Sequence, residues 1–211
     1  MILSVSLFSA TFVFVDQTSN VKPADAATAP TGNPDTTFNT NVGTTVGYSV
    51  ASIATDTSGR TYLGTVGGGI RRYALDGTID STFNTAANAV LGATSTINSI
   101  AIDGAGNVFA ALGATGVKGV TSTGASMAAF NAGAAVVGSG TSNVTGIKAQ
   151  TINAIAVVYT GTAAATKIIV GTSSAPYVRS LTISGTLDAT YNTAVGSTTV
   201  TAPVYAMGLD S

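Results

Sequence analysis

The chain has 211 residues, of which 8 are Lys or Arg and 9 are acidic, so charged residues make up 8% of it, against about 25% in an ordinary soluble domain. His, Cys and Trp are absent, and every acidic residue is Asp. Without an imidazole, a thiolate or a Glu carboxylate, the composition argues against catalysis and against a metal or cofactor site. A net charge of −1 with scattered cations argues equally against nucleic acid as a partner.

Apolar residues make up 45% of the chain, and the mean hydropathy is +0.43. They are spread widely, and no stretch approaches the roughly 18 to 20 uninterrupted apolar residues that a membrane-spanning helix needs. We therefore expect no membrane span. Since so few side chains are charged, solubility rests on Ser, Thr, Asn and Gly, and such a surface does not repel further copies of itself.

The first predicted element is an apolar segment at residues 1–26. Apolar and polar side chains alternate there and switch parity once, which predicts two strands joined at a bulge or tight turn. The residues expected to form this assembly or closure strand are Leu3, Val5, Leu7, Phe8, Phe12 and Phe14. The same stretch, followed by an Ala24-Asp25-Ala26 cleavage pattern, also fits a secretory signal, although no Lys or Arg precedes it. Both interpretations stay open, and the strand is favoured.

Residues 27–211 contain an internal repeat, seen most easily at an aromatic residue followed by Asn. Each copy continues through a loop of small residues into a short apolar strand, and in three of the four copies an Asp follows that strand. The repeat aromatics are Phe38, Phe83, Phe130 and Tyr191, and the strands are centred on Ile53, Ile100, Ile155 and Met207. Because the aromatics recur with the unit, we expect them to anchor the core.

Two more strands follow in the better-preserved copies, separated by turns of the type Asp76-Gly77-Thr78. Helical periodicity is almost absent. The sequence therefore predicts an all-β fold of about four units, each with three to four short antiparallel strands. Periods of about 40 to 60 residues with several strands per unit are typical of β-propeller blades.

One stretch carries a resemblance to a known family. The residues Asp76-Gly-Thr-Ile-Asp80-Ser-Thr-Phe83, followed by a strand that ends at Asp103-Gly104, resemble the delta-sixty type of β-propeller repeat. The match is good around residues 76–103 and weaker elsewhere. The resemblance implies a propeller architecture, and it implies kinship with surface and virion-associated proteins without known catalysis.

The two ends of the sequence leave the closure of the predicted ring open. The sequence stops at Asp210-Ser211, where the first strand of a further unit should turn into its second. Pairing of both termini in one sheet would close a ring of four units. Two other readings are that the native chain continues beyond Ser211, and that the N-terminal strands pair with a neighbouring subunit.

Three motifs could be taken for ligand sites. The loops at 103–107 and 76–80 resemble calcium loops in outline but lack dense acidic ligands, so turn formation explains them better. The glycines at 67–69 lack the Lys-Ser/Thr and the helix start of a phosphate cradle, and they predict another turn. Arg71-Arg72 is expected to present one exposed and one inward side chain on an edge strand. We therefore predict no catalytic, metal-binding or cofactor-binding residue.

These observations favour a non-enzymatic structural subunit of a large extracellular or virion assembly, such as a filament, a surface layer or a phage particle. Such a subunit would act through contacts with copies of itself or with other structural subunits. The alternative is an adhesin or receptor-binding propeller module that recognises a glycan or a host surface. Either role places the protein on a virion or at the extracellular or cell surface.

Overall fold

The computed structural model describes residues 34–43, 45–138, 151–159, 161–174, 177–195 and 200–208, which all belong to one compact part of the chain, Pro34–Ser211. The predicted strand segment at 1–26, with Leu3, Val5, Leu7, Phe8, Phe12 and Phe14, lies outside the described residues.

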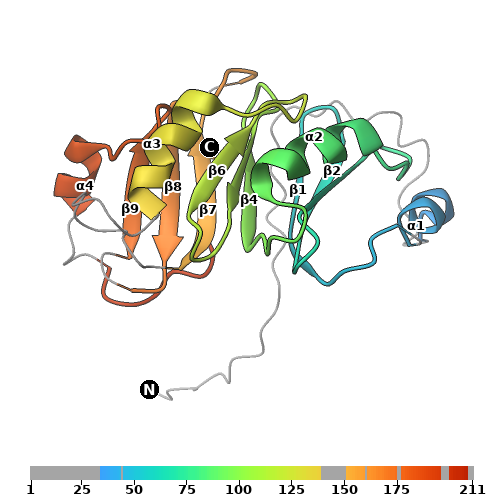
Figure 1. Cartoon of the computed structure of the whole chain (residues 1–211), viewed down its shortest axis with the longest axis horizontal. Coiled ribbons are helices and arrows are strands. Elements are labelled where there is room, and N and C mark those ends of the chain that lie inside the picture. The colour runs from blue at the N-terminus through green and yellow to red at the C-terminus, as the bar shows by residue number, and fades with distance from the viewer. Residues whose placement is uncertain are drawn as a thin grey trace, which may run out of the picture. The chain divides into compact units, whose positions relative to one another are not determined.

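Three antiparallel sheets of three strands each follow one another along the chain (Figure 1). In every sheet the strands pair in sequence order, so that the second strand lies in the middle. The strands are β1 (Val50–Thr55), β2 (Thr61–Thr65) and β3 (Ile70–Tyr73) in unit 1, β4 (Ser99–Ile102), β5 (Val108–Ala111) and β6 (Val117–Val120) in unit 2, and β7 (Ile152–Val158), β8 (Lys167–Thr172) and β9 (Val178–Thr182) in unit 3. The propeller-like repeat of short antiparallel strands is confirmed.

A helix follows each sheet, which the sequence did not predict. These are α2 (Ser81–Leu91) in unit 1, α3 (Ala128–Gly138) in unit 2 and α4 (Ala189–Val195) in unit 3, while α1 (Thr36–Gly43) precedes β1. The buried face of α2 combines Phe83 and Leu91 with Ala87 and two Asn residues. Because small and polar residues fill so much of that face, the apolar period of a helix is hidden in the sequence.

The Asp that precedes the repeat aromatic caps the helix. Asp80 accepts a hydrogen bond from the Phe83 N–H at 2.9 Å, and Asp188 accepts one from Tyr191 at 3.1 Å. An Asp at this position satisfies one of the four free N–H groups that begin a helix, and its charge is favourable there. The turn predicted at Asp76-Gly77-Thr78 is present, but the loop of small residues predicted after the repeat aromatic is wrong, because a helix begins there.

The Asn that follows the repeat aromatic binds the third strand of its own sheet. Asn131 accepts a hydrogen bond from the Gly119 N–H at 2.6 Å and donates one to the Gly119 carbonyl at 2.9 Å. Asn192 makes the same pair of contacts with Ser180, at 2.9 and 3.1 Å. The side-chain amide thus forms hydrogen bonds with the backbone N–H and carbonyl groups at the sheet edge, which a fourth strand would otherwise bind.

The core lies at the junctions between units. One apolar cluster joins unit 1 to unit 2 and contains Phe83, and a second joins unit 2 to unit 3 and contains Phe130. Both rings are 1% exposed, and each meets an aromatic ring of its own sheet edge to face, with centroids 5.6 and 5.2 Å apart. The prediction that the repeat aromatics anchor the core is confirmed for these two. Phe38 and Tyr191, on the outer helices, are only partly buried.

The Asp residues after the first strands form turns, as predicted. The Asp103 carboxylate accepts backbone N–H bonds from Ala105 at 3.0 Å and Asn107 at 2.8 Å, and also one from Ala165 of unit 3 at 2.8 Å. Gly106 has φ +80°, which suits glycine at this place in the turn. The loop at 67–69 connects β2 to β3 as an ordinary turn.

Removing the helix Asn should weaken the fold. In Asn131→Ala the buried N–H of Gly119 loses its acceptor, so we expect the free energy of unfolding to fall by about 1–3 kcal/mol. Urea unfolding followed by circular dichroism measures it. The matched control is Asn39→Ala, at the same place in α1, where the side chain is exposed and the cost should stay within about 0.5 kcal/mol. Equal losses in both variants would show that binding of the strand is not the cause.

Candidate interaction sites

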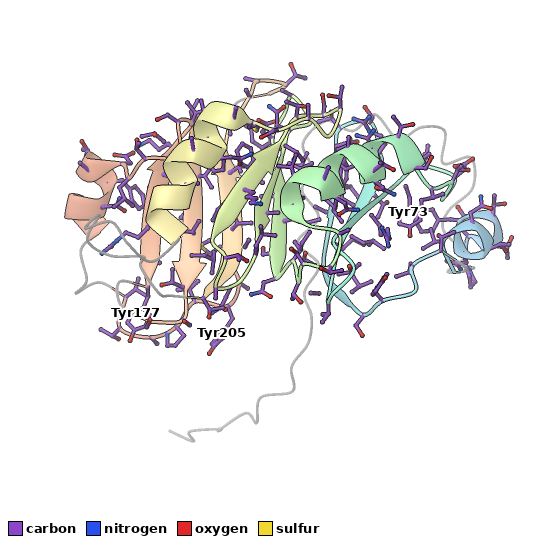
Figure 2. The ribbon with its side chains drawn as sticks, viewed as in Figure 1. Tyr73, Tyr177 and Tyr205 are labelled. Atoms are coloured by element: carbon purple, nitrogen blue, oxygen red, sulfur yellow. The ribbon has the colours of Figure 1, made fainter. Side chains whose placement is uncertain are left out.

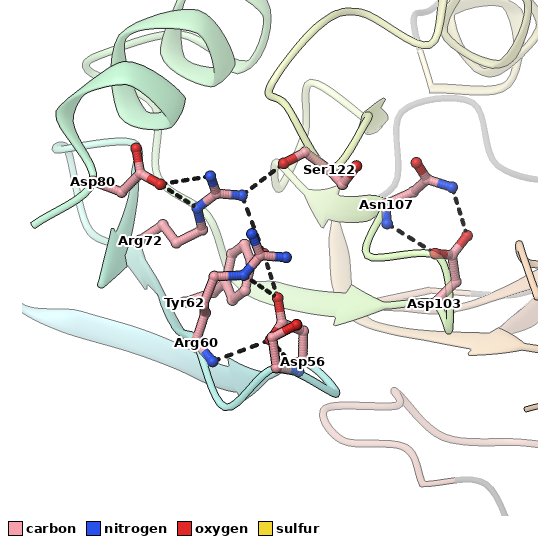
Figure 3. Close-up of polar contacts among 9 residues, drawn as sticks. Asp56, Arg60, Tyr62, Arg72, Asp80, Asp103, Asn107 and Ser122 are labelled. Atoms are coloured by element: carbon pink, nitrogen blue, oxygen red, sulfur yellow. Dashed lines mark hydrogen bonds and ion pairs between the residues drawn. The ribbon is translucent and has the colours of Figure 1, made fainter. Parts of the chain in front are cut away.

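The first candidate site is a polar cluster around Arg72 of β3, at the junction of units 1 and 2 (Figure 3). Its Nε and Nη2 donate to one oxygen of Asp80, at 3.0 and 2.6 Å, and its Nη1 donates to the Ser122 carbonyl of unit 2 at 2.7 Å. The guanidinium also lies over the Phe83 ring, 3.8 Å from its centroid. Each guanidinium nitrogen has a partner, so Arg72 joins the two units.

Asp56 is the buried partner on the other side of the cluster. Its side chain is 1% exposed, and it accepts hydrogen bonds from Arg60 Nε at 2.6 Å and from the Tyr62 hydroxyl at 2.9 Å. Burial and the bond to Asp56 raise the pKa of Tyr62, although Arg72 opposes them. Burial disfavours the charge of Arg60, but the hydrogen bond to Asp56 and the nearby negative charges together outweigh it, so the pKa of Arg60 lies above its usual value. Both shifts favour the protonated forms of Tyr62 and Arg60 at neutral pH.

Asp80 completes the cluster at the start of α2. Partial burial favours its neutral form, but the hydrogen bonds from the Phe83 N–H and from Arg72 outweigh it, and the pKa of Asp80 lies below its usual value. One carboxylate thus caps a helix and pairs with the cation that joins two units.

A cavity of about 420 Å³ opens beside this cluster. It is lined by Arg60, Arg72, Asp80, Thr82, Phe83, Ala105, Ser122 and Thr123. The charged groups at its wall are already paired with one another, so the cavity offers hydroxyl and guanidinium hydrogen bonds but no activated nucleophile. Among the residues that the structure describes, no group of three or more His, Cys, Asp or Glu could hold a metal ion.

Arg71 and Arg72 lie on opposite sides of the edge strand β3, as predicted, but Arg71 is half-buried rather than exposed. Arg72 is 6% exposed and points inward, while Arg71 is half-buried on the opposite side of β3, with its guanidinium 5.5 Å from the Tyr48 ring centroid. Lys118 occupies the position of Arg71 in unit 2, and its Nζ donates to the Val90 carbonyl in the last turn of α2 at 2.6 Å. A cation suits that place because carbonyls at a helix end carry partial negative charge. A cation therefore recurs at this position of the third strand. It was not predicted, because the cations look scattered along the sequence.

The second candidate site is an exposed apolar surface on unit 1, called here the unit-1 face. It consists of Tyr48, Val50, Ile53 and Val66, which are 46%, 48%, 59% and 49% exposed. The residues of unit 2 at the positions of Val50 and Ile53 are Ile97 and Ile100, which are 0% and 7% exposed, and those of unit 3 are Ile152 and Ile155, at 1% and 4%. In units 2 and 3 the preceding unit covers this surface.

The third candidate site is the C-terminal segment, residues 200–208. Here the predicted strand around Met207 is not formed among the described residues, although the Val204 N–H donates to the Thr172 carbonyl of β8 at 3.1 Å. Figure 2 labels Tyr205 along the lower edge of the view, and Tyr205 is 73% exposed.

No known protein family matches the chain, and no curated protein matches it either. Among solved structures, it is similar to the computationally designed Ika4 protein, with 11% identity, a TM-score of 0.49, and coverage of 78% of this chain and 82% of that one. It is also similar to the computationally designed Ika8 protein (12%, TM-score 0.46, 77% and 40%) and to the Dos1 propeller (10%, TM-score 0.43, 66% and 35%). Within the described part of the chain, no helix is long and apolar enough to cross a membrane.

The ion pair between Arg72 and Asp80 should make the free energy of unfolding depend on pH in the acidic range. Because the folded-state pKa of Asp80 is lowered, its contribution is complete above the unfolded carboxyl pKa of about 4 and is lost as the pH falls through the lowered value. Asp80→Asn should therefore cost about 2 kcal/mol at pH 7, where it leaves the buried Arg72 charge without its partner, and much less at pH 2.

Urea unfolding at both pH values measures this difference. The matched control is Asp76→Asn, because Asp76 also accepts a backbone N–H bond, from Thr78 at 2.9 Å, but is exposed. It should change stability by less than about 0.5 kcal/mol. A pH-independent cost for Asp80→Asn would contradict the role of the charge.

Proposed function

We propose that the protein is a non-enzymatic structural subunit of a large extracellular or virion assembly, and that it acts through contacts between subunits. The observation that carries this proposal is the unit-1 face. Val50 and Ile53 are exposed on unit 1, whereas the equivalent residues of the other two units are buried by a neighbouring unit. Contiguous exposed apolar side chains of this kind mark interaction surfaces.

Covering the unit-1 face would be favourable. Full burial of one Val or Ile side chain contributes about 1.5–3 kcal/mol, so even partial burial of the three such residues of this face amounts to several kcal/mol before the cost of association. The low charge supports the same conclusion. With 17 charged residues of nearly balanced sign, copies of the chain meet little long-range repulsion.

The polar residues of unit 1 support a non-enzymatic role. Arg72, Asp80 and Asp56 are held by one another and by backbone groups, and each has a structural partner. An arrangement for chemistry would present such groups to a substrate. The setting, a virion or an extracellular surface, rests on the resemblance to delta-sixty repeats and on the charge-poor surface.

A charge on the unit-1 face should prevent self-association. We expect wild-type protein to form oligomers whose mass grows with concentration, and Ile53→Asp to remain monomeric, because a carboxylate would be buried without a partner. Sedimentation velocity over a range of concentrations measures the mass of the oligomers, and circular dichroism checks that the variant is folded.

The matched control is Leu75→Asp. Leu75 is 65% exposed, like Ile53, but it lies in the turn after β3 and outside the unit-1 face. This variant should associate like wild type. If the wild-type protein stays monomeric at high concentration, the proposed function is wrong.

A second candidate function is binding of a glycan or host surface, and the observation that favours it is the cavity beside Arg60. Its wall combines hydroxyls with one partly exposed guanidinium, groups that suit the hydroxyls of a sugar. If this function holds, a glycan array should show saturable binding that Thr82→Val and Thr123→Val weaken together. Unchanged binding in the double variant would place the glycan elsewhere, and no binding by wild type would exclude the function.

A further inference from the structure

We propose that residues 204–208 of one copy pack on the unit-1 face of a second copy, in a head-to-tail joint that repeats the junction between neighbouring units of one chain. This inference rests on the proposed function, because it names the partner and the surface through which the subunit assembles. It concerns two surfaces of the described residues that are exposed in the single chain.

The start of a further unit is already in place after unit 3. At the junction of units 1 and 2 the Ile97 N–H donates to the Thr65 carbonyl of β2 at 3.0 Å, and the Ile152 N–H of unit 3 donates to Gly113 at 3.1 Å. Val204 repeats the contact of Ile97, because its N–H donates to the carbonyl of Thr172, which holds the place of Thr65 in its own sheet. Val204 therefore takes the position that opens units 2 and 3.

The glycines of the middle strands repeat the same junction. A Cβ added at Gly64 of β2 would lie 2.9 Å from the Ile97 side chain, and one added at Gly171 of β8 would lie 2.6 Å from that of Val204. In both sheets the missing side chain lets the first residue of the next unit lie directly on the strand. By this register Ala206 corresponds to Ser99, and Ile53 corresponds to Ile155.

First strands of neighbouring units contact each other through these positions. The Ile155 N–H of β7 donates to the Ser99 hydroxyl of β4 at 3.2 Å, and the Asn98 amide reaches forward to the Ile152 carbonyl at 3.0 Å. In the C-terminal segment, Ala206 corresponds to Ser99 and Tyr205 corresponds to Asn98, and both are exposed. The C-terminal segment is thus one half of a junction.

The unit-1 face is the other half. Val50 and Ile53 correspond to residues of units 2 and 3 that pack against the preceding unit and are buried there. The helix of a preceding unit is also present, since α1 meets the turn after β3 as α2 meets the turn after β6. A Cβ at Gly77 would lie 2.7 Å from the Phe38 carbonyl, and one at Gly124 would lie 2.9 Å from that of Phe83.

The partner is a second copy because the two halves, both within the described residues, do not cover each other in one chain. Tyr205 is 73% exposed and Ile53 is 59% exposed in the same molecule, so neither covers the other. A joint between different surfaces of identical copies is heterologous, and it continues from copy to copy until a ring closes or a filament grows. Such a joint suits a structural subunit.

The absence of Cys makes the joint testable by crosslinking. Two single variants, Ile53→Cys and Ala206→Cys, are mixed in otherwise full-length protein and treated with dibromobimane, a short thiol crosslinker. We expect a crosslinked dimer several-fold more abundant than in a mixture of Ile183→Cys with Ala206→Cys, because Ile183 is 42% exposed but lies in the turn after β9.

The variant that carries both Ile53→Cys and Ala206→Cys separates the remaining outcomes. A ladder of dimers, trimers and larger species supports the joint. Crosslinking within the monomer alone overturns it, because the chain would then close on itself. Crosslinking no stronger than with Ile183→Cys also overturns it, and if sedimentation still shows oligomers that Ile53→Asp abolishes, the proposed function stands while the unit-1 face has a different occupant.

Discussion

The structure depends on one constraint, which is that a three-stranded sheet of short strands cannot bury its apolar side chains alone. Each sheet has four to seven residues per strand, and its core residues lie at the junction with a neighbouring unit. Repeat architectures gain stability mainly from such junctions. The same constraint makes the two ends of the described array chemically different from its middle, and two of the three candidate interaction sites, the unit-1 face and the C-terminal segment, lie at those ends.

Many polar side chains in this protein form hydrogen bonds with backbone groups. Helix Asn residues bind the edge of the third strand, Asp residues cap helices or form turns, and Arg72 connects two units through Asp80 and the Ser122 carbonyl. With 17 charged residues in the chain, little charge remains for a solvated surface or for chemistry. A charge-poor repeat of this kind is suited to contacts with copies of itself.

Sequence reasoning found the repeat, its period and its turn residues, because Asp, Gly and aromatic residues recur at fixed spacing. It missed the helices, since Ala and Asn fill much of the buried face of α2 beside Phe83 and leave no clear apolar period. It also could not find the unit-1 face. Ile53 and Ile155 look alike in the sequence, and they differ only in whether a neighbouring unit covers them.

The sequence by itself determined the class of fold and the poverty of catalytic groups, because residue types and their spacing act locally in turns, caps and strands. Only the tertiary structure decided that the helix amide of Asn131 completes a sheet edge and that Arg72 joins two units. These contacts join residues 12 and 50 positions apart, and their partners are backbone groups that any residue type carries. The tertiary structure likewise decided which apolar residues stay exposed, because their exposure depends on whether a neighbouring unit covers them. The sequence of a single repeat does not contain that information.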